Sequence, residues 1–582
     1  MPETYRLSNA HRPSLPPGSY EIKISWNLEV DGKKLEEAND SARFKVASER
    51  FWLDPAEIES VYPPEGTTGD YSNDLAHIAF CRDTLPWERS AKAGSDAPWL
   101  GLLLLNEEET AQCPLTTMTL QGYKDRLAAY SPPIAVHLEP GEEKESAQVI
   151  ELPQTVPDGV LPQLRELSLL AHARVTENAA VIVNTVGVIA SKRLPSSGRN
   201  VAHLVALENR FTGDEFPLPV SGGRCLLISL KSWSFTSQPA AANAQSTQSP
   251  FERLKPSWLQ LSSTRTSYEK AGFVPLPHRF RSGESTASWY AGPLSCGVPI
   301  FSPQDAAKLV KLPAECADDL LWYDESLGML NVTYAAAWEL GRLLAIQNRT
   351  MFSLLHKWRR QQIHCHQAMT AGAHDAACCH IPQIQCACAE PAPQAAPELK
   401  EWISGLRKLQ GIPYRYLLPD ERLLPSDSIR FLAIDQNYIS ALLDGVFSSV
   451  RAPSRCPDEC RKGELELLGG GPPEVTGFLL RSKTVAALPR LEVTANVANA
   501  SKNPYHSARL SPSILLYLFE GRVSKVTLRQ KPDTIHLTIK RLANFTWSNQ
   551  EKRALALYGT SSAEFAKGLL DYPEELVVSV GW

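Results

Sequence analysis

The sequence lacks the short motifs by which many enzyme families are recognised. It has neither the G-x-S-x-G segment of a serine hydrolase nor the H-E-x-x-H pair of a zinc protease. The glycine run at 469–471 lacks the spacing and the following Lys-Ser/Thr of a phosphate-binding loop, and two prolines come next. The sequence therefore contains no recognisable catalytic centre. An enzyme whose site is assembled only by the tertiary structure is still compatible with it.

The sequence also lacks an excess of charge and any long apolar run. Its 59 basic and 64 acidic residues give a net charge of -5, so no overall field attracts nucleic acid. No window of 18 consecutive apolar residues occurs, and the polar, proline-rich residues 1–18 do not have the pattern of a secretory signal. We therefore expect a cytoplasmic protein, with its 12 cysteines mostly reduced, that binds neither nucleic acid nor membrane.

The length of 582 residues and a hydrophobic content of 43% predict several separate cores. We expect a multidomain α+β protein with a β-rich, sandwich-like N-terminal half, a helical centre, and a C-terminal β-meander with a short helix. The expected sections are a disordered tail at 1–18, a β-rich domain at 19–150, a mixed α/β section at 151–300 with a flexible loop at 237–249, a mainly helical section at 301–450 interrupted by a Cys/His-rich and Pro/Ala loop at 364–397, and a final section at 451–582.

Apolar periodicity predicts the individual elements. Residues 20–30 alternate between apolar and polar, which is typical of a strand, and residues 42–47 are expected to pair in the same sheet. Residues 161–177 have the spacing of an amphipathic helix. Residues 334–360 are the strongest helical pattern and predict one continuous helix in which Trp338 is buried.

The remaining elements are shorter. We expect helices at 398–409 and 437–446, a loop at 456–473, strands at 514–519, 523–529, 534–539 and 575–580, and a capped helix at 561–570.

Residues 364–388 contain an unusual density of metal-binding side chains, namely His364, Cys365, His366, His374, Cys378, Cys379, His380, Cys386 and Cys388. Thiolate and imidazole bind zinc, but the pairs here lack the usual two- to four-residue gap of structural zinc sites. We expect an inert surface insertion. Zinc binding and redox-active disulfides are the alternatives.

Two proline-rich segments place charged and aromatic residues on stiff loops. The residues in question are His278, Arg279, Arg281, Trp289 and Tyr290 in the first segment and Asp420, Glu421 and Arg422 in the second. Such loops can form a binding site. We favour the other interpretation, a buried arginine–carboxylate brace between domains.

Five stretches make the sequence resemble a family of uncharacterised microbial proteins, bacterial and fungal, of similar length. They are LPWER at 85–89 with 98–103 after it, WYAGPL at 289–294, YAAAWELGRLLA at 334–345, PYRYLLPDERLLPSDSIRF at 413–431 and TGFLLRS at 476–482. The resemblance spans most of the chain and implies one integrated protein. It brings no known activity, and it implies that the region after the long helix is a variable linker.

Two classes of function follow. The first is a non-enzymatic interaction or assembly protein, with protein partners or self-association. The second is an enzyme of an unfamiliar class, such as one of specialised metabolism, with a small-molecule pocket between the helical and β sections. A deep pocket with convergent polar groups would favour the enzyme, and a large exposed apolar patch would favour assembly.

Overall fold

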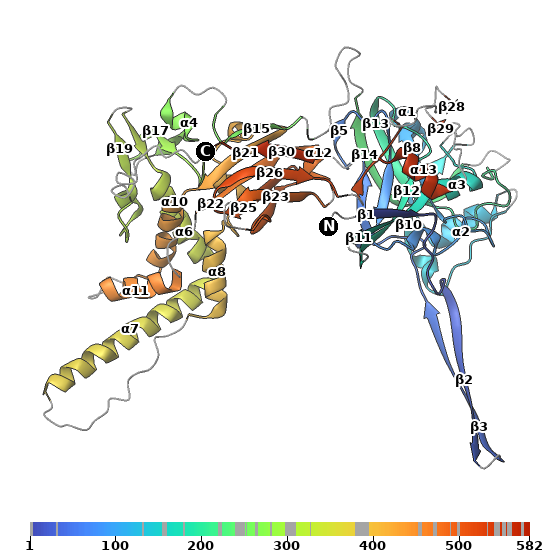
Figure 1. Ribbon diagram of the computed structural model, residues 1–582, viewed down its shortest axis with the longest axis horizontal. Helices are drawn as coiled ribbons and strands as arrows, with labels where there is room; N and C mark the ends of the chain where they lie inside the picture. Colours follow the sequence, from blue (N-terminus) through green and yellow to red (C-terminus); the bar gives the residue numbers. More distant parts are fainter. Residues whose placement is uncertain are drawn as a thin grey trace. The chain divides into compact units, whose positions relative to one another are not determined.

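The computed structural model of the chain combines helices and sheets throughout (Figure 1). It describes residues 4–30, 33–130, 133–153, 160–178, 181–218, 224–238, 251, 253–261, 266–279, 282–296, 310–325, 328–378, 395–451, 457–468, 474–488, 490–497, 501–531, 534–539, 547–549, 554–555, 561–571 and 575–581. A content of 28% helix and 38% strand confirms the mixed α+β class. Among the described residues, no helix is long and apolar enough to cross a membrane.

The chain divides into two compact units, each built from segments that are distant in sequence. The first comprises Met1–Phe251, Ala487–Glu492 and Arg529–Glu575, and the second Glu252–Ala486, Val493–Leu528 and Leu576–Trp582. The section boundaries stay a prediction. The disordered tail expected at 1–18 is wrong, because residues 4–8 form a strand that pairs with residues 173–177. The flexible loop expected at 237–249 lies outside the described residues from 239 onward.

Two antiparallel sheets share the main core of the first unit. One has the order β1 (Thr4–Ser8), β11 (Ala171–Asn178), β12 (Val181–Ala190), β7 (His77–Phe80), β4 (Ile58–Tyr62). The other has the order β8 (Leu100–Asn106), β13 (Gly198–Ala206), β14 (Cys225–Ser237), β10 (Ser146–Leu152), β9 (Leu115–Thr119), with β5 (Thr68–Gly69) parallel to β14. Ile78 and Ile189 from one sheet and Leu102, Leu204 and Trp233 from the other belong to one apolar cluster, so the sheets pack face to face.

The helix predicted at 161–177 is wrong. Only α3 (Leu164–Leu170) is helical, and the chain continues directly into β11. This strand is hydrogen-bonded on both sides, to β1 and β12, and Ala171 to Thr176 are all buried. A strand buried on both faces loses its alternation, so its apolar residues are easily read as a helical stripe.

The rest of the first unit adds short elements. The helices are α1 (Glu107–Gln112), α2 (Leu120–Ala128) and α13 (Ser562–Leu569), and the short pairs are β6 (Asp74–Leu75) with β27 (Leu537–Thr538) and β28 (Trp547–Asn549) with β29 (Ala554–Leu555). Ser561 caps α13 through its hydroxyl, as its sequence predicts. A separate two-stranded sheet, β2 (Gly18–Val30) and β3 (Lys33–Val46), confirms the strands predicted at 20–30 and 42–47 and makes the second one longer.

The described residues of the second unit form three sheets. They are β15 (Lys255–Trp258), β21 (Ser428–Ile434), β22 (Val475–Arg481), β25 (Ile514–Glu520), β24 (His506–Ser511), with β18 (Leu294–Ser295) on β21; β16 (Val274–Arg279), β17 (Ser285–Tyr290), β20 (Met329–Asn331), β19 (Trp322–Asp324); and β23 (Glu492–Val497), β26 (Val523–Arg529), β30 (Glu575–Ser579). The predicted C-terminal meander is wrong, because β25 and β26 enter different sheets and β27 pairs with β6.

The helices of the second unit are α4 (Ser267–Lys270), α6 (Thr333–Gln347), α7 (Arg349–Cys378), α8 (Pro397–Arg407), α9 (Tyr414–Leu417), α10 (Gln436–Ser448), α11 (Pro457–Leu468) and α12 (Lys483–Ala486). The predictions at 398–409 and 437–446 are confirmed by α8 and α10. The loop predicted at 456–473 is wrong, because it contains α11.

The continuous helix predicted at 334–360 is also wrong, although Trp338 is buried as expected. Asn348 has a ψ of 89°, which ends α6, and its side-chain oxygen accepts a hydrogen bond from the backbone N–H of Met351 at 3.2 Å. The asparagine thus starts the next helix as an N-terminal cap. That helix, α7, runs on to Cys378, so the interruption expected from 364 onward does not begin there.

Candidate functional site

The β2–β3 hairpin presents an apolar face that no other described part of its own chain covers fully. Ile22, Ile24 and Trp26 on β2 are 52%, 55% and 62% exposed, and Phe44 on β3 is 37% exposed. Phe44 lies opposite Tyr20 in the strand register, and the two rings stack with 5.5 Å between centroids. Figure 1 shows the two described strands without a third strand beside either of them. We refer to this face as the apolar hairpin face.

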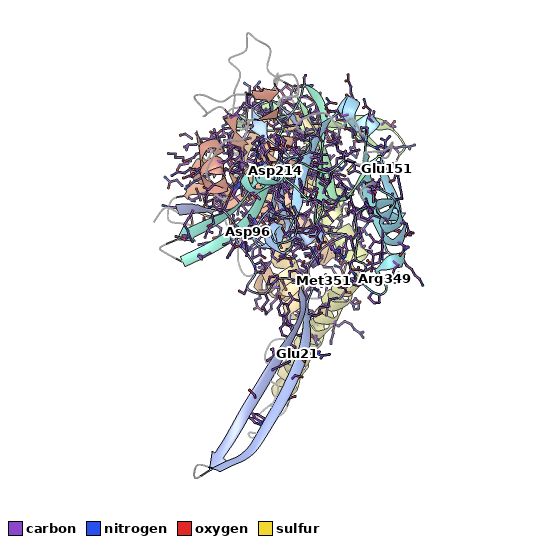
Figure 2. All side chains as sticks on the ribbon, turned by 90° about the vertical axis from the view of Figure 1, so that its right-hand side faces the viewer. Glu21, Asp96, Glu151, Asp214, Arg349 and Met351 are labelled. Carbon is purple, nitrogen blue, oxygen red and sulfur yellow. The ribbon has the colours of Figure 1, made fainter. Side chains whose placement is uncertain are left out.

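The opposite face of the hairpin is charged. Glu21 forms ion pairs with Arg43 on the neighbouring strand at 3.2 Å and with Lys23 at 3.2 Å. Figure 2 labels Glu21 on this hairpin. At the root of the hairpin, Lys45 forms an ion pair with Glu139. Because neighbours along a strand point to opposite faces, the alternation of residues 20–26 separates the apolar from the charged side chains.

The first group of predicted site residues lies on strands, not loops. His278 and Arg279 are at the end of β16, and Trp289 and Tyr290 are at the end of the neighbouring strand β17. His278 Nδ1 is 2.9 Å from the hydroxyl of Ser288, which is itself fully buried. Arg281 lies outside the described residues.

The aromatic residues of this group take part in packing. Trp289 is buried and stacks on Tyr268 at 5.3 Å, and the hydroxyl of Tyr290 is 3.3 Å from the hydroxyl of Tyr438. Burial raises the pKa of Tyr290, which keeps its phenol neutral. These contacts hold β17 against its surroundings and fit a structural role.

The second group forms a local, exposed pair. Asp420 accepts the backbone N–H of Arg422 at 2.8 Å and three further bonds from the guanidinium, at 2.6 Å, 3.0 Å and 3.1 Å. The hydrogen bonds from Arg422 lower the pKa of Asp420. The side chains of Glu421 and Arg422 are 82% and 74% exposed, so the buried brace expected here is wrong.

The Cys/His tract stays a prediction. Cys365, His366, His374 and Cys378 belong to the backbone range of α7, and their side chains lie outside the description. Cys379, His380, Cys386 and Cys388 lie outside the described residues altogether. Among the side chains that are described, no group of three or more His, Cys, Asp or Glu residues is placed to hold a metal ion.

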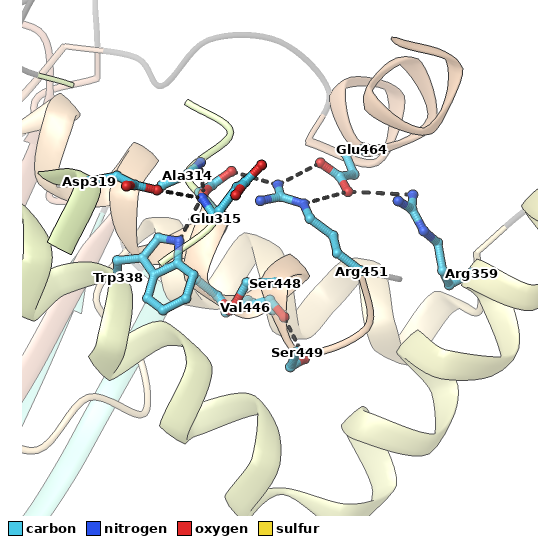
Figure 3. Close-up of polar contacts among 12 residues, drawn as sticks. Ala314, Glu315, Asp319, Trp338, Arg359, Val446, Ser448, Ser449, Arg451 and Glu464 are labelled. Atoms are coloured by element: carbon cyan, nitrogen blue, oxygen red, sulfur yellow. Dashed lines mark hydrogen bonds and ion pairs between the residues drawn. The ribbon is translucent and has the colours of Figure 1, made fainter. Parts of the chain in front are cut away.

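A buried ion network, which the sequence did not reveal, joins the helices of the second unit (Figure 3). Asp444 on α10 accepts the indole N–H of Trp338 on α6 at 2.9 Å and the guanidinium of Arg451 at 2.6 Å. Glu464 on α11 pairs with Arg451 at 2.9 Å and with Arg359 on α7 at 3.4 Å. Burial opposes charge on Arg451, but the hydrogen bonds that it donates to the two carboxylates raise its pKa. Opposite charges meet in pairs, so the network braces four helices.

A second polar cluster lies in the core of the first unit. Arg174 on β11 is 1% exposed; it donates to His172 Nε2 at 3.1 Å and to the carbonyl of Ile535. Burial, followed by the charge of Arg174, lowers the pKa of His77 to about 3, and the same causes place the pKa of His172 well below its usual value. Tyr62 stacks on His77 at 5.3 Å. Neutral imidazoles buried this deeply do not meet a ligand from solvent, and the hydrogen bond from Arg174 fixes the segment at 535 to the sheet.

A small cavity of about 110 Å³ lies in the second unit between α8, α10 and the ends of β22 and β25. Arg407, Lys408, Gln436, Tyr505 and Glu520 line it, and the Lys408 ammonium is 5.3 Å from the centre of the Tyr505 ring. Pockets for small organic ligands have volumes of about 300–1,000 Å³. This cavity therefore gives little support to a substrate site.

Of these features, the apolar hairpin face is the one that fits contact with a partner. The alternation of residues 20–30 was visible in the sequence, and it predicted the strand but not which face would stay exposed. No protein-family model, no curated protein and no solved structure matches this chain. The exposure of Ile22, Ile24 and Trp26 is thus the main evidence on what the protein does.

Proposed function

We propose that this protein is a non-enzymatic interaction or assembly protein that binds another protein through the apolar hairpin face. The single observation that carries the proposal is the exposure of Ile22, Ile24 and Trp26 in one row along β2. Cytoplasmic location and membership of the uncharacterised microbial family belong to the same proposal, on the sequence features described above.

The β2–β3 hairpin gains stability if a partner covers its apolar face. An isolated two-stranded hairpin is marginally stable in water, and hairpins normally gain stability by packing an apolar face. Burial of a large apolar side chain contributes about 1.5–3 kcal/mol relative to its exposed state. Three such side chains in a row on β2 therefore offer a partner several kcal/mol of binding free energy, before the cost of association.

The alternative of an enzyme with a pocket between helical and β sections has weaker support. The cavity beside Tyr505 lies between helices and strands of the second unit, but its volume of about 110 Å³ holds only a few water molecules. A small-molecule substrate is therefore not part of the proposal.

Site-specific photocrosslinking in the producing cells tests the proposal. A benzophenone amino acid at Ile24 lies on the apolar hairpin face, and the same amino acid at Ser25 lies on the opposite face of the same strand. We expect a protein adduct from position 24 and little from position 25. Equal yields at both positions, or none at either, would show that the hairpin does not bind a protein.

A further inference from the structure

We propose that the partner is a second copy of this chain, and that the apolar hairpin faces of two copies pack on each other about a two-fold axis parallel to the strands. This inference rests on the proposed function and adds to it the identity of the partner. Its evidence is the distribution of size, area and charge over the hairpin.

The two strands carry side chains of different size on the apolar hairpin face. Directly opposite residues of an antiparallel pair share a face, so Ile22 stands beside Ala42, and Ile24 beside Asp40. At these positions the side chains of β2 therefore project further from the sheet than those of β3. A two-fold axis along the hairpin lays β2 of each copy over β3 of the other, which puts Ile22 of each copy over Ala42 of its partner. The face is therefore complementary to itself in size at this position, whereas Ile24 of each copy lies over Asp40 of its partner.

The exposed area of the described apolar side chains supplies most, but not all, of the area that a specific dimer requires. With on the order of 200 Å² for a fully exposed large side chain, the exposed fractions of Ile22, Ile24, Trp26 and Phe44 leave roughly 400 Å² on one hairpin. Two facing hairpins then bury about 800 Å² from these side chains, close to the ~1,000 Å² that a specific interface exceeds. Both strands extend beyond these residues, to Val30 and from Lys33, which adds further contact length.

Charge allows a second copy to approach. Residues 18–46 contain five basic and six acidic residues, a net charge of -1, so two hairpins do not repel each other over a distance. The ion pair between Glu21 and Arg43 lies on the opposite face and stays in water when the apolar faces meet. A strongly acidic or basic partner finds no complementary field here.

Asp40 is the polar exception among the described residues of the apolar hairpin face. It is exposed, and its carboxylate accepts the backbone N–H of Ser41 at 2.8 Å. In the two-fold arrangement this carboxylate lies under Ile24 of the partner copy, so association removes part of its water. Its partial desolvation opposes association, so Asp40→Ala should make the dimer tighter.

Sedimentation velocity of the purified full-length protein over a range of concentrations tests the dimer. We expect a species of twice the mass of the chain. Ile24→Lys should raise the dissociation constant at least tenfold, and Ser25→Lys, which adds the same charge on the opposite face, should leave it within about twofold. Circular dichroism controls for folding. A wild-type protein that stays monomeric, or an equal effect of the two lysines, overturns the inference.

Cross-linking between two differently tagged copies tests the geometry. A copy with Ile22→Cys mixed with a copy with Ala42→Cys should be joined by a short bismaleimide, because facing sheets lie about 10 Å apart, too far for a disulfide. Lys23→Cys with Ser41→Cys, a register pair on the charged face, should not be joined. Mixtures with the wild-type chain measure the background from native cysteines. A dimer without the first cross-link overturns the two-fold arrangement.

The outcomes separate the two proposals. If the benzophenone at Ile24 gives an adduct with a mass other than that of two chains, and the purified protein is monomeric, the hairpin binds a different protein. The proposed function then stands and the self-association fails. If position 24 gives no adduct in cells and the purified protein is monomeric, both fail.

Discussion

Replacement of Gly341 by alanine should strongly destabilise the second unit. Gly341 on α6 and Gly445 on α10 face each other's helices where these cross. A Cβ atom on Gly341 would lie 1.8 Å from the carbonyl oxygen of Leu442, and one on Gly445 would lie 1.8 Å from the carbonyl oxygen of Trp338. Both obstructing atoms belong to the backbone, so no side-chain rotation can relieve the clash.

The expected magnitude follows from the displacement. Real Cβ atoms essentially never come closer than 3.0 Å to such atoms, so the helices must separate by about 1 Å in a core packed as densely as a crystal. Overpacking of this kind costs about 1–3 kcal/mol, and the gap opened beside Trp338 adds a loss of packing of similar size. The better helix propensity of alanine returns about 1 kcal/mol. We expect a net destabilisation of about 3 kcal/mol for Gly341→Ala.

Hydrogen exchange measured by mass spectrometry is the appropriate assay, because a chain with two units need not unfold in one transition. Peptides from α6 and α10 should exchange faster in Gly341→Ala, while peptides from β12 in the first unit should not change. Gly405→Ala in α8 is the matched control, since its Cβ would meet only the flexible side chain of Gln410, with the nearest atom at 3.0 Å. Unchanged or slower exchange in α6 of Gly341→Ala would refute the steric argument.

Three further predictions concern buried and cysteine-rich sites. The pKa of His77 is about 3 when folded, against an ordinary value of 6.5, so its contribution to stability is complete above pH 6.5 and falls by about 1.4 kcal/mol per pH unit below it. In urea unfolding between pH 6.5 and 5, His77→Asn should therefore lose less stability than the wild type. An equal loss of stability in the two proteins contradicts this. Trp338→Ala should cost about 3–5 kcal/mol and Trp338→Phe about 1–2 kcal/mol, since phenylalanine loses only the bond to Asp444 and some volume; an unfolding midpoint of Trp338→Phe equal to that of the wild type argues against a contribution from the bond. Elemental analysis under reducing conditions should find no tightly held zinc, and one zinc per chain that is lost on Cys386→Ser with Cys388→Ser reverses this expectation.

Local chemistry predicted part of the fold from the sequence. The alternation at 20–30 predicted β2, the apolar spacing at 437–446 predicted α10, and the hydroxyl of Ser561 predicted the start of α13. In each case the information lies within a few turns of helix or one strand, where periodicity and capping decide the structure.

The sequence predicted the strand of the candidate site but not the exposure of its apolar face. The strand that carries Ile22 and Trp26 was predicted, but a period of two shows only that one face is apolar. Whether that face is covered depends on residues far along the chain, and here Ile24 stays 55% exposed. The predicted site residues Trp289 and Asp420 turned out to serve packing and a local surface pair.

Long-range packing decided the rest. Residues 171–178 are a strand because β1 and β12 hydrogen-bond to it on both sides, and the strands from 514 to 539 divide among three sheets because partners far away in sequence, such as β22 and β6, pair with them. Glu464 meets Arg451 and Arg359 only after α11 has packed against α7 and the segment that follows α10. The sequence by itself determined where helices and strands can form, because that depends on neighbouring residues. Only the tertiary structure decided which strands pair, which charges are buried together and which apolar face remains in water, because those depend on contacts between residues that are distant in the chain.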